Sequence, residues 1–242
     1  MSLSWIFFDA GNTLIGLDYS RLVRALAAGG FHLDELQLRR AELSARRDLD
    51  RAILQRWSDR TVPRTGWIEA KVWGDFWRRV VEIAGADSYR AADLAREVLK
   101  VTRPASSWDR VESTTPAALD RLIAMGYRLG VISNSSGTLV EHMTRIGLAS
   151  RFEVIVDSAE VGVEKPHPEI FGIALERAGL PEPSRALYVG DIYAIDVLGA
   201  AGAGMHAMLF DPLGQWEPES LPEGAPACRA LKSLAELPEL LA

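Results

Sequence analysis

Residues 7–14 read FFDAGNTL and place one carboxylate directly after a run of apolar and aromatic residues. The run from Ser4 to Phe8 predicts a short core strand, which ends at Asp9 and Gly11. A strand that carries an aspartate into a glycine-containing turn is a suitable support for a carboxylate nucleophile. No second acid follows within the turn, so the chemistry open to Asp9 depends on residues elsewhere in the chain.

The sequence pattern changes twice after this stretch. From Tyr19 to Lys100 apolar residues recur at intervals of three and four, which predicts a helical subdomain. After Pro116 expected strands alternate with expected helices; the strands are RLGVIS, FEVIVDS, ALYVGD and MHAMLF, and the last helices are AIDVLGAAGAG and SLAELPELLA. This alternation predicts an α/β fold, a Rossmann-like, doubly wound parallel sheet with helices on both faces.

Polar residues follow the expected strands at several points along the chain, namely Asp9, Ser133, Asn134, Asp191 and Asp196, with Lys165 in the loop VGVEKPHP. Because parallel strands end at the same edge of a sheet, we expect these side chains to meet there. Two carboxylates would repel each other and an incoming phosphate unless Mg²⁺, which prefers hard oxygen ligands, lay between them. A lysine would add positive charge, and a serine hydroxyl could bind a phosphate oxygen.

Four segments, taken in order, resemble the motifs of the haloacid dehalogenase-like (HAD) hydrolase superfamily, in particular its members with a helical cap. These segments are FFDAGNTL, VISNSS, VEKPHPEIF and VGDIYAIDVLGAAGAGM. The resemblance covers nearly the whole chain. It implies a catalytic core made of residues 1–16 and 104–242, and a helical cap domain inserted as residues 17–103, between the first and second motifs.

The resemblance also implies a role for each matching residue. Asp9 would be the nucleophile, and Lys165 would stabilise the charge on Asp9 and on the phosphoryl oxygens. The transferred group would be contacted by Thr13 and Ser133, with Asn134 beside it. The ligands of Mg²⁺ would be Asp9, the backbone carbonyl of Gly11 and Asp191, while Asp196 would bind through water or orient other groups.

One position departs from the family pattern. Phosphatases of this family usually carry a second aspartate two residues after the nucleophile, as general acid and then base, and here that position is Gly11. General acid catalysis contributes about 10²- to 10⁴-fold in rate, so a simple alcohol would leave a phosphate ester poorly. Three outcomes stay open: substrates with good leaving groups, an acid supplied by the cap, or chemistry that needs no acid, such as carbon–halogen cleavage.

The dehalogenase branch of the family also lacks the second aspartate. Members of that branch have a site without metal, usually with serine and asparagine where this chain has Gly190 and Asp191. We therefore expect a Mg²⁺-dependent phosphatase acting on a small phosphorylated metabolite through an aspartyl-phosphate. A 2-haloacid dehalogenase is the first alternative, and a weakly active relative that binds a phosphometabolite or a protein is the second.

Composition limits the remaining possibilities. The chain has 242 residues, 48% of them hydrophobic and 25% charged, which fits a globular protein large enough for one core with an insertion. A net charge of −6 is unfavourable for binding a nucleic-acid backbone. No apolar run approaches the roughly 20 residues of a membrane helix, so we expect a cytoplasmic protein that uses neither membrane nor nucleic acid. The sequence does not set the oligomeric state.

Overall fold

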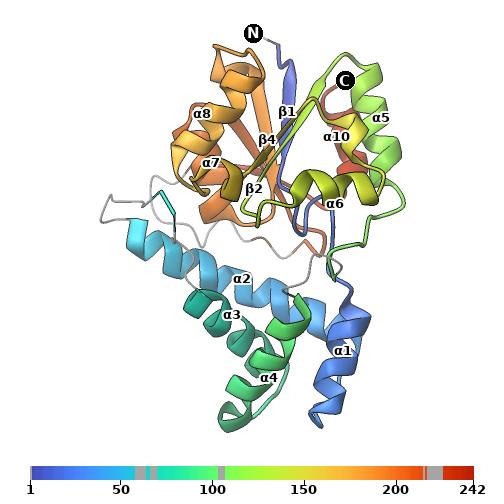
Figure 1. The fold of residues 1–242 in the computed structure, drawn as a ribbon, viewed down its shortest axis with the longest axis vertical. Helices are drawn as coiled ribbons and strands as arrows, with labels where there is room; N and C mark the ends of the chain where they lie inside the picture. The colour runs from blue at the N-terminus through green and yellow to red at the C-terminus, as the bar shows by residue number, and fades with distance from the viewer. Residues whose placement is uncertain (1, 58–63, 66–69, 103–106, 215, 217–225) are drawn as a thin grey trace. The chain divides into compact units, whose positions relative to one another are not determined.

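The computed structural model describes residues 2–57, 64–65, 70–102, 107–214, 216 and 226–242 (Figure 1). The chain divides into two compact units, one made of Met1–Ile15, Val62–Thr65 and Val111–Ala242, and the other of Gly16–Thr61 and Gly66–Arg110. The cap boundary expected between residues 103 and 104 lies outside the described residues. The division after residues 16 and 103 therefore stays a prediction.

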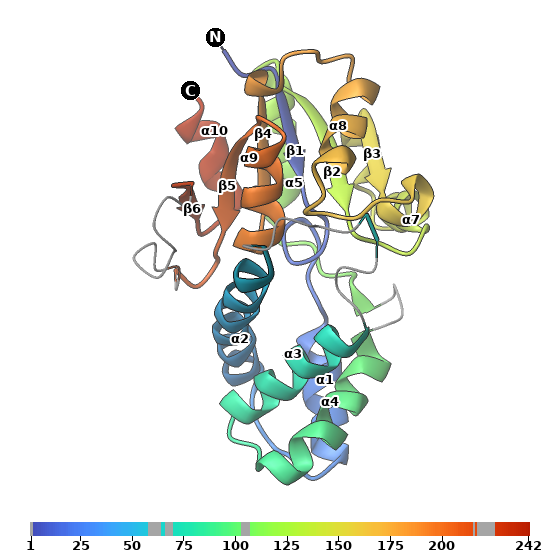
Figure 2. The same cartoon turned by 90° about the vertical axis from the view of Figure 1, so that its left-hand side faces the viewer.

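The first unit is built on a sheet of six parallel strands. The strands are β1 (Trp5–Phe8), β2 (Arg128–Ser133), β3 (Val154–Asp157), β4 (Ala186–Gly190), β5 (His206–Phe210) and β6 (Arg229–Leu231). Their order is β3-β2-β1-β4-β5-β6, which Figure 2 shows from right to left. This is the doubly wound order predicted by the alternating sequence, and it reverses direction between β1 and β4, where such sheets bind their ligands.

Helices cover both faces of this sheet, as the parallel strand connections require. The helices α8 and α9 lie on one face, and α5 and α10 lie on the other (Figures 1 and 2). The α-helices of this unit are α5 (Thr115–Ala124), α6 (Leu139–Arg145), α7 (Ser158–Val161), α8 (Pro168–Arg177), α9 (Leu198–Gly202) and α10 (Leu237–Leu240). The α8 helix begins with Pro168 after His167, whose ring Nδ1 accepts a hydrogen bond from the Glu169 amide at 3.3 Å.

Aromatic side chains fill the core between the sheet and α8. Trp5 and Phe7 stack with their ring centroids 5.3 Å apart, and both are buried. The ring of Phe7 occupies the space above Gly130 in β2, where an added Cβ would lie 2.5 Å from the ring. A side chain at position 130 would therefore push this aromatic layer off the sheet, so glycine here is a packing requirement.

Three local features differ from the sequence-based expectations. The short strand β6 was not expected, because its three residues give no alternating pattern. The segment expected as one helix from Ala194 begins instead with a π-helical turn, Tyr193–Val197, before α9. The expected terminal helix divides into a 3₁₀ turn, Leu234–Glu236, and the single-turn α10. A capping box at Ser233 and Glu236 fixes the start of that 3₁₀ turn.

The second unit is helical in its described residues. It contains α1 (Tyr19–Ala28), α2 (Glu35–Trp57), α3 (Ala70–Ile83) and α4 (Ser88–Thr102). The apolar positions expected at helical spacing are buried only in part: Trp77, Val80 and Val81 of α3 lie in the core, whereas Trp73 is half-buried and Leu36 of α2 is 48% exposed. A buried polar group also links two helices: the Tyr19 hydroxyl donates to Glu42, which pairs with Arg46 at 2.8 Å.

The chain enters and leaves this helical unit at adjacent points. The Gly16 amide donates to the Arg110 carbonyl at 2.6 Å, and the Arg110 amide donates back to the Gly16 carbonyl at 3.2 Å. The two passes of the chain are thus paired like neighbouring antiparallel strands. Within the described part of the chain, no helix is both long enough and apolar enough to cross a membrane.

Candidate active site

Asp9 lies in the first residue after β1, at the point where the strand order reverses. Its amide donates to the Val189 carbonyl of β4 at 2.8 Å, which extends the β1–β4 pairing by one step. The chain then turns tightly, because the amides of Leu14 and Ile15 both bond to the Ala10 carbonyl, at 3.0 and 2.9 Å. Asn12 has a φ of 56° in this turn, a left-handed conformation that asparagine adopts more readily than most residues.

The side chain of Lys165 reaches Asp9 from the loop before α8. Its Nζ lies 2.6 Å from Asp9 Oδ1, 2.7 Å from Asp196 Oδ1 and 2.9 Å from the hydroxyl of Tyr188. An ammonium group has three donor hydrogens, and here each has an acceptor. Lys165 is only 2% exposed, so the buried cation is fully hydrogen-bonded and faces two carboxylates.

Burial and neighbouring charge shift the pKa of both main groups. Burial raises the pKa of Asp9 to about 6, against the opposing charge of Lys165 and with a further upward contribution from Asp196. Burial alone would lower the pKa of Lys165, but Asp196 and Asp9 outweigh it, so that pKa is raised. At neutral pH, Asp9 is therefore mostly an ionised carboxylate beside a permanent cation, as a nucleophile requires.

Three buried carboxylates gather at this edge of the sheet. One oxygen from each of Asp9, Asp191 and Asp196 lies within 4.8 Å of the other two. Carboxylates this close together repel one another when both are ionised, unless a cation lies between them. Hard oxygen donors at this separation fit Mg²⁺, so the chemistry of the donor set agrees with the expected metal.

Asp196 approaches the backbone of Gly190 more closely than any side chain there would allow. A Cβ added to Gly190 would lie 2.3 Å from Cγ of Asp196 and 2.5 Å from its Oδ2. Asp196 Oδ2 also accepts from the Ile192 amide at 3.0 Å, while its Oδ1 holds Lys165. Glycine at position 190 therefore allows Asp196 to fold back over the end of β4, where it orients Lys165.

Ser133 and Asn134 extend the same edge beyond β2. Ser133 is buried at the last position of the strand. The amide group of Asn134 is engaged with the backbone of Lys165: its Nδ2 donates to the Lys165 carbonyl at 2.9 Å, and its Oδ1 accepts from the Lys165 amide at 2.7 Å. This pair of hydrogen bonds fixes the main chain from which the lysine side chain extends.

Thr13 lies in the turn after Asp9. Its Oγ1 is buried and has no hydrogen-bond partner among the described residues. A buried hydroxyl of this kind is costly unless something else bonds to it, so Thr13 has donor and acceptor capacity to offer a ligand. The backbone carbonyl of Gly11, the remaining expected metal ligand, belongs to the same turn.

Comparison with known proteins assigns the chain to a family. The model of the haloacid dehalogenase-like hydrolases matches residues 3–204. The chain belongs to the haloacid dehalogenase-like hydrolases. It is 38% identical over 129 residues to the pyrimidine 5'-nucleotidase YjjG of Escherichia coli, covering 52% of this chain and 56% of that protein. It is also 38% identical over 133 residues to the glyceraldehyde 3-phosphate phosphatase of Methanothermobacter thermautotrophicus, covering 53% and 57%.

The matches thus span little more than half the length of these relatives. Among solved structures, the magnesium-bound HAD-hydrolase YfnB of Bacillus subtilis superposes with a TM-score of 0.62 at 18% identity, covering 100% of this chain and 99% of that one. At that identity the likeness shows the fold, which agrees with the predicted sheet and helical insertion. The comparisons therefore show a hydrolase whose relatives include phosphatases.

Two residues of this candidate site were missed from the sequence. Tyr188 lies inside the expected strand ALYVGD, where an aromatic residue reads as core, and nothing local indicates that its hydroxyl bonds Lys165. Asp157 ends β3 fully buried, and its carboxylate accepts from the amides of Gly137, Leu139 and Ala159 at 2.9, 3.2 and 3.0 Å. It holds the loop that follows Ser133 and Asn134, and its place at a strand end was the available signal.

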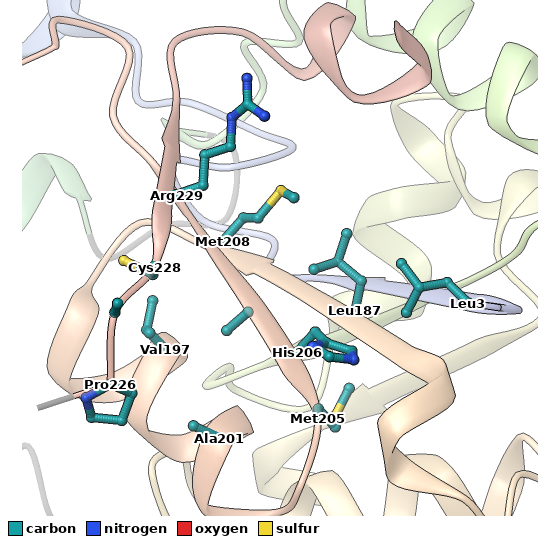
Figure 3. Close-up of a pocket in the computed structure, with 12 residues that line it drawn as sticks. Leu3, Leu187, Val197, Ala201, Met205, His206, Met208, Pro226, Cys228 and Arg229 are labelled. Atoms are coloured by element: carbon teal, nitrogen blue, oxygen red, sulfur yellow. The ribbon is translucent and has the colours of Figure 1, made fainter. Parts of the chain in front are cut away.

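A separate hollow of about 600 Å³ lies elsewhere in the sheet-containing unit (Figure 3). Its lining is mostly apolar and includes Leu187 of β4, Ala201 of α9 and Met208 of β5, together with Met205 and Cys228, which directly precede β5 and β6. The carboxylates of the candidate site lie beyond the opposite, carboxyl ends of the strands. This hollow is therefore distinct from the site around Asp9.

Proposed function

We propose that this hydrolase is a Mg²⁺-dependent phosphatase of small phosphorylated metabolites, with Asp9 as the nucleophile. The observation that carries the proposal is the buried group of three carboxylates, two of which bond the ammonium of Lys165. This group lies where the strand order of the sheet reverses, between β1 and β4. The relatives named as a nucleotidase and a phosphatase support the same substrate class. Residues 17–103 would act as the cap that selects the substrate.

Asp9 would perform the first chemical step. One carboxylate oxygen attacks phosphorus, the bond from phosphorus to the leaving oxygen breaks, and that oxygen departs with the electron pair. The product is an aspartyl-phosphate on Asp9. Lys165 holds positive charge beside the attacking carboxylate, while Ser133 and Thr13 offer hydroxyl groups to the phosphoryl oxygens. Asn134 acts through the backbone of Lys165, which its amide group fixes.

Water then hydrolyses the aspartyl-phosphate, which returns Asp9 as a carboxylate and releases inorganic phosphate. Asp9, Asp191 and Asp196, with the carbonyl of Gly11, would hold Mg²⁺, which when bound neutralises charge on the phosphoryl group. Asp196 is bonded at both oxygens: Lys165 donates to Oδ1, with the Tyr188 hydroxyl 3.3 Å from the same oxygen, and the Ile192 amide donates to Oδ2. It is therefore suited to orient Lys165 and to contact the metal through water.

Gly11 restricts the substrates that such a site can process. With glycine in the usual position of the general acid, the leaving oxygen departs without a proton from that residue. Acyl phosphates and activated aryl phosphates leave as weakly basic anions, so they are the substrates that this site favours. We expect their turnover to exceed that of simple alkyl phosphates.

The packing of Gly190 favours this proposal over the 2-haloacid dehalogenase. A serine at position 190, as in the dehalogenase branch, would place its Cβ within 2.3–2.5 Å of the Asp196 side chain. The position of Asp196 and the presence of Asp191 thus go together with glycine here. A site that retains these carboxylates is suited to a metal, and hence to phosphate.

A substrate panel tests the proposal. Purified protein is assayed with and without Mg²⁺ on p-nitrophenyl phosphate, acetyl phosphate, sugar phosphates and 2-chloropropionate. Asp9→Asn is the inactive variant, and Asp93→Asn, at an exposed position in α4, is the matched control. We expect Mg²⁺-dependent phosphate release that is fastest for acetyl and aryl phosphates and is lost in Asp9→Asn alone.

Two results would contradict the proposal. Halide release without metal would make the protein a dehalogenase, and inactivity on every substrate with retained phosphate binding would make it a binding module. Gly11→Asp tests the leaving-group argument separately. Added acid catalysis should raise alkyl-phosphate turnover, by up to about 10²- to 10⁴-fold. If turnover does not rise, the missing acid was not what limited it.

A further inference from the structure

Tyr188 connects the ammonium of Lys165 to the backbone of β2. It lies in β4, but its hydroxyl is 2.9 Å from the Ile132 carbonyl of β2, and β1 lies between these two strands. The side chain therefore extends across the face of β1 beneath the site. Phe171 of α8 packs edge-on against its ring, with centroids 5.2 Å apart. Tyr188 is fully buried, so the position of its hydroxyl is fixed from two sides.

The directions of the hydrogen bonds follow from the chemistry of the partners. An ammonium only donates, so the Tyr188 oxygen accepts from Lys165 Nζ at 2.9 Å. A carbonyl only accepts, so the phenol hydrogen is directed to the Ile132 carbonyl at 2.9 Å, which is shorter than its 3.3 Å approach to Asp196 Oδ1. Lys165 thereby links to β2 through a neutral group as well as to its two carboxylates.

The three acceptors of Lys165 differ in what the reaction does to them. Asp9 loses its negative charge when it becomes an ester, and Asp196 lies in the group of carboxylates suited to a metal. Tyr188 is the neutral acceptor, and it neither reacts nor lies in that carboxylate group. Its hydrogen bond is therefore the contact of Lys165 that stays constant while the other two change.

We propose that Tyr188 is a positioning residue that holds the Lys165 ammonium beside Asp9 throughout the reaction. The idea rests on the proposed function, since it assigns Lys165 a role in phosphoryl transfer. Without the hydroxyl, Lys165 would follow Asp196 or solvent when Asp9 is esterified. Displacement of a charged group by about 1 Å from its productive place lowers the rate by about 10²-fold.

Tyr188→Phe is the test, because it removes the hydroxyl and keeps the ring. The matched control is Tyr127→Phe, which also removes a hydroxyl that donates to a carbonyl, that of Leu241 at 3.1 Å, at the opposite end of β2. With p-nitrophenyl phosphate and Mg²⁺, we expect Tyr188→Phe to lower kcat by about ten- to a hundredfold and to change KM less than about threefold. Tyr127→Phe should leave both constants unchanged.

A second measurement does not need activity. In ¹⁵N-lysine-labelled protein, the ammonium hydrogens of Lys165 should exchange slowly with water in the wild type, because all three are bonded and buried. Exchange should become faster in Tyr188→Phe and stay slow in Tyr127→Phe. Fast exchange in the wild type would overturn the proposal even if the variant failed to fold, and so would a kcat in folded Tyr188→Phe within twofold of wild type. A wild type without phosphatase activity but with slow exchange would instead refute the proposed function alone.

Discussion

Replacement of Gly190 by alanine should damage both the stability and the chemistry of this protein. The added Cβ would lie 2.3–2.5 Å from three atoms of Asp196, including its Cβ, and ordinary contacts between such atoms begin near 3.4 Å. Because the Cβ of Asp196 is close to its own backbone, rotation of the side chain alone cannot relieve the overlap. The backbone at Asp196, in the π-helical turn Tyr193–Val197, would have to move away from β4.

The magnitude follows from two contributions. Overpacking of a buried position costs about 1–3 kcal/mol. Displacement of Asp196 also weakens its bonds to Lys165 and to the Ile192 amide, and hydrogen bonds to charged groups contribute about 1.5–3 kcal/mol each. Since the displaced carboxylate regains part of this from water, we expect Gly190→Ala to lower the free energy of unfolding by about 3 kcal/mol.

Urea unfolding followed by circular dichroism measures this loss. Gly172→Ala is the matched control, because position 172 lies in α8, is exposed and has nothing within 4 Å of an added Cβ. That change should raise stability by about 0.5–1 kcal/mol, since alanine favours helix over glycine. A loss in Gly190→Ala below about 1 kcal/mol, within the lowest cost of overpacking, would show that Asp196 does not pack against β4 as described.

Four further predictions concern charge and capping. Because burial raises the pKa of Asp9 to about 6, protons compete with Mg²⁺ below that pH, and calorimetry should show about tenfold weaker binding at pH 5 than at pH 7. In metal-free protein, the folded state holds the Asp9 proton more tightly than the unfolded state does. The contribution of Asp9 to the free energy of unfolding should therefore fall as the pH rises from about 4 to 6. Urea titrations of the wild type and of Asp9→Asn across this pH range measure that fall. Asp157→Ala leaves three backbone amides without their acceptor and should cost about 3 kcal/mol in urea unfolding, whereas an unchanged midpoint would mean that the loop after β2 does not depend on them. Glu153→Gln removes an exposed pair with Arg128 and should cost about 0.5 kcal/mol, an effect present above the ordinary glutamate pKa and lost as pH falls through the lowered pKa of Glu153.

The sequence was sufficient to predict which strand ends would meet. Asp9 and Asp191 directly follow apolar runs, and the parallel arrangement of those runs requires their ends to share one edge. Lys165, in the loop VGVEKPHP, was expected at the same edge, and the resemblance to a known family then gave it a role beside Asp9. The structure brings all three together with Asp196, while the catalytic roles of these residues stay proposals.

The connections beneath the site could not be predicted from the sequence. Tyr188 meets Ile132 across β1, and this contact depends on strand order and register, which no local pattern specifies. The need for glycine at position 190 arises from the close approach of Asp196, six residues later, through a π-helical turn that the sequence suggests as an ordinary helix. Contacts across strands and unusual turns are properties of the assembled fold.

The pairing of Gly16 with Arg110 has a consequence for how such proteins can be changed. An inserted segment whose two ends are hydrogen-bonded to each other is already closed, so its length adds little to the entropy lost when the sheet forms. The helices between these two residues can therefore be exchanged for another set with a similarly closed base while the strands keep their register. If the helical unit selects the substrate as proposed, a graft of this kind, joined at Ile15 and Val111, would change selectivity while leaving the sheet unaltered.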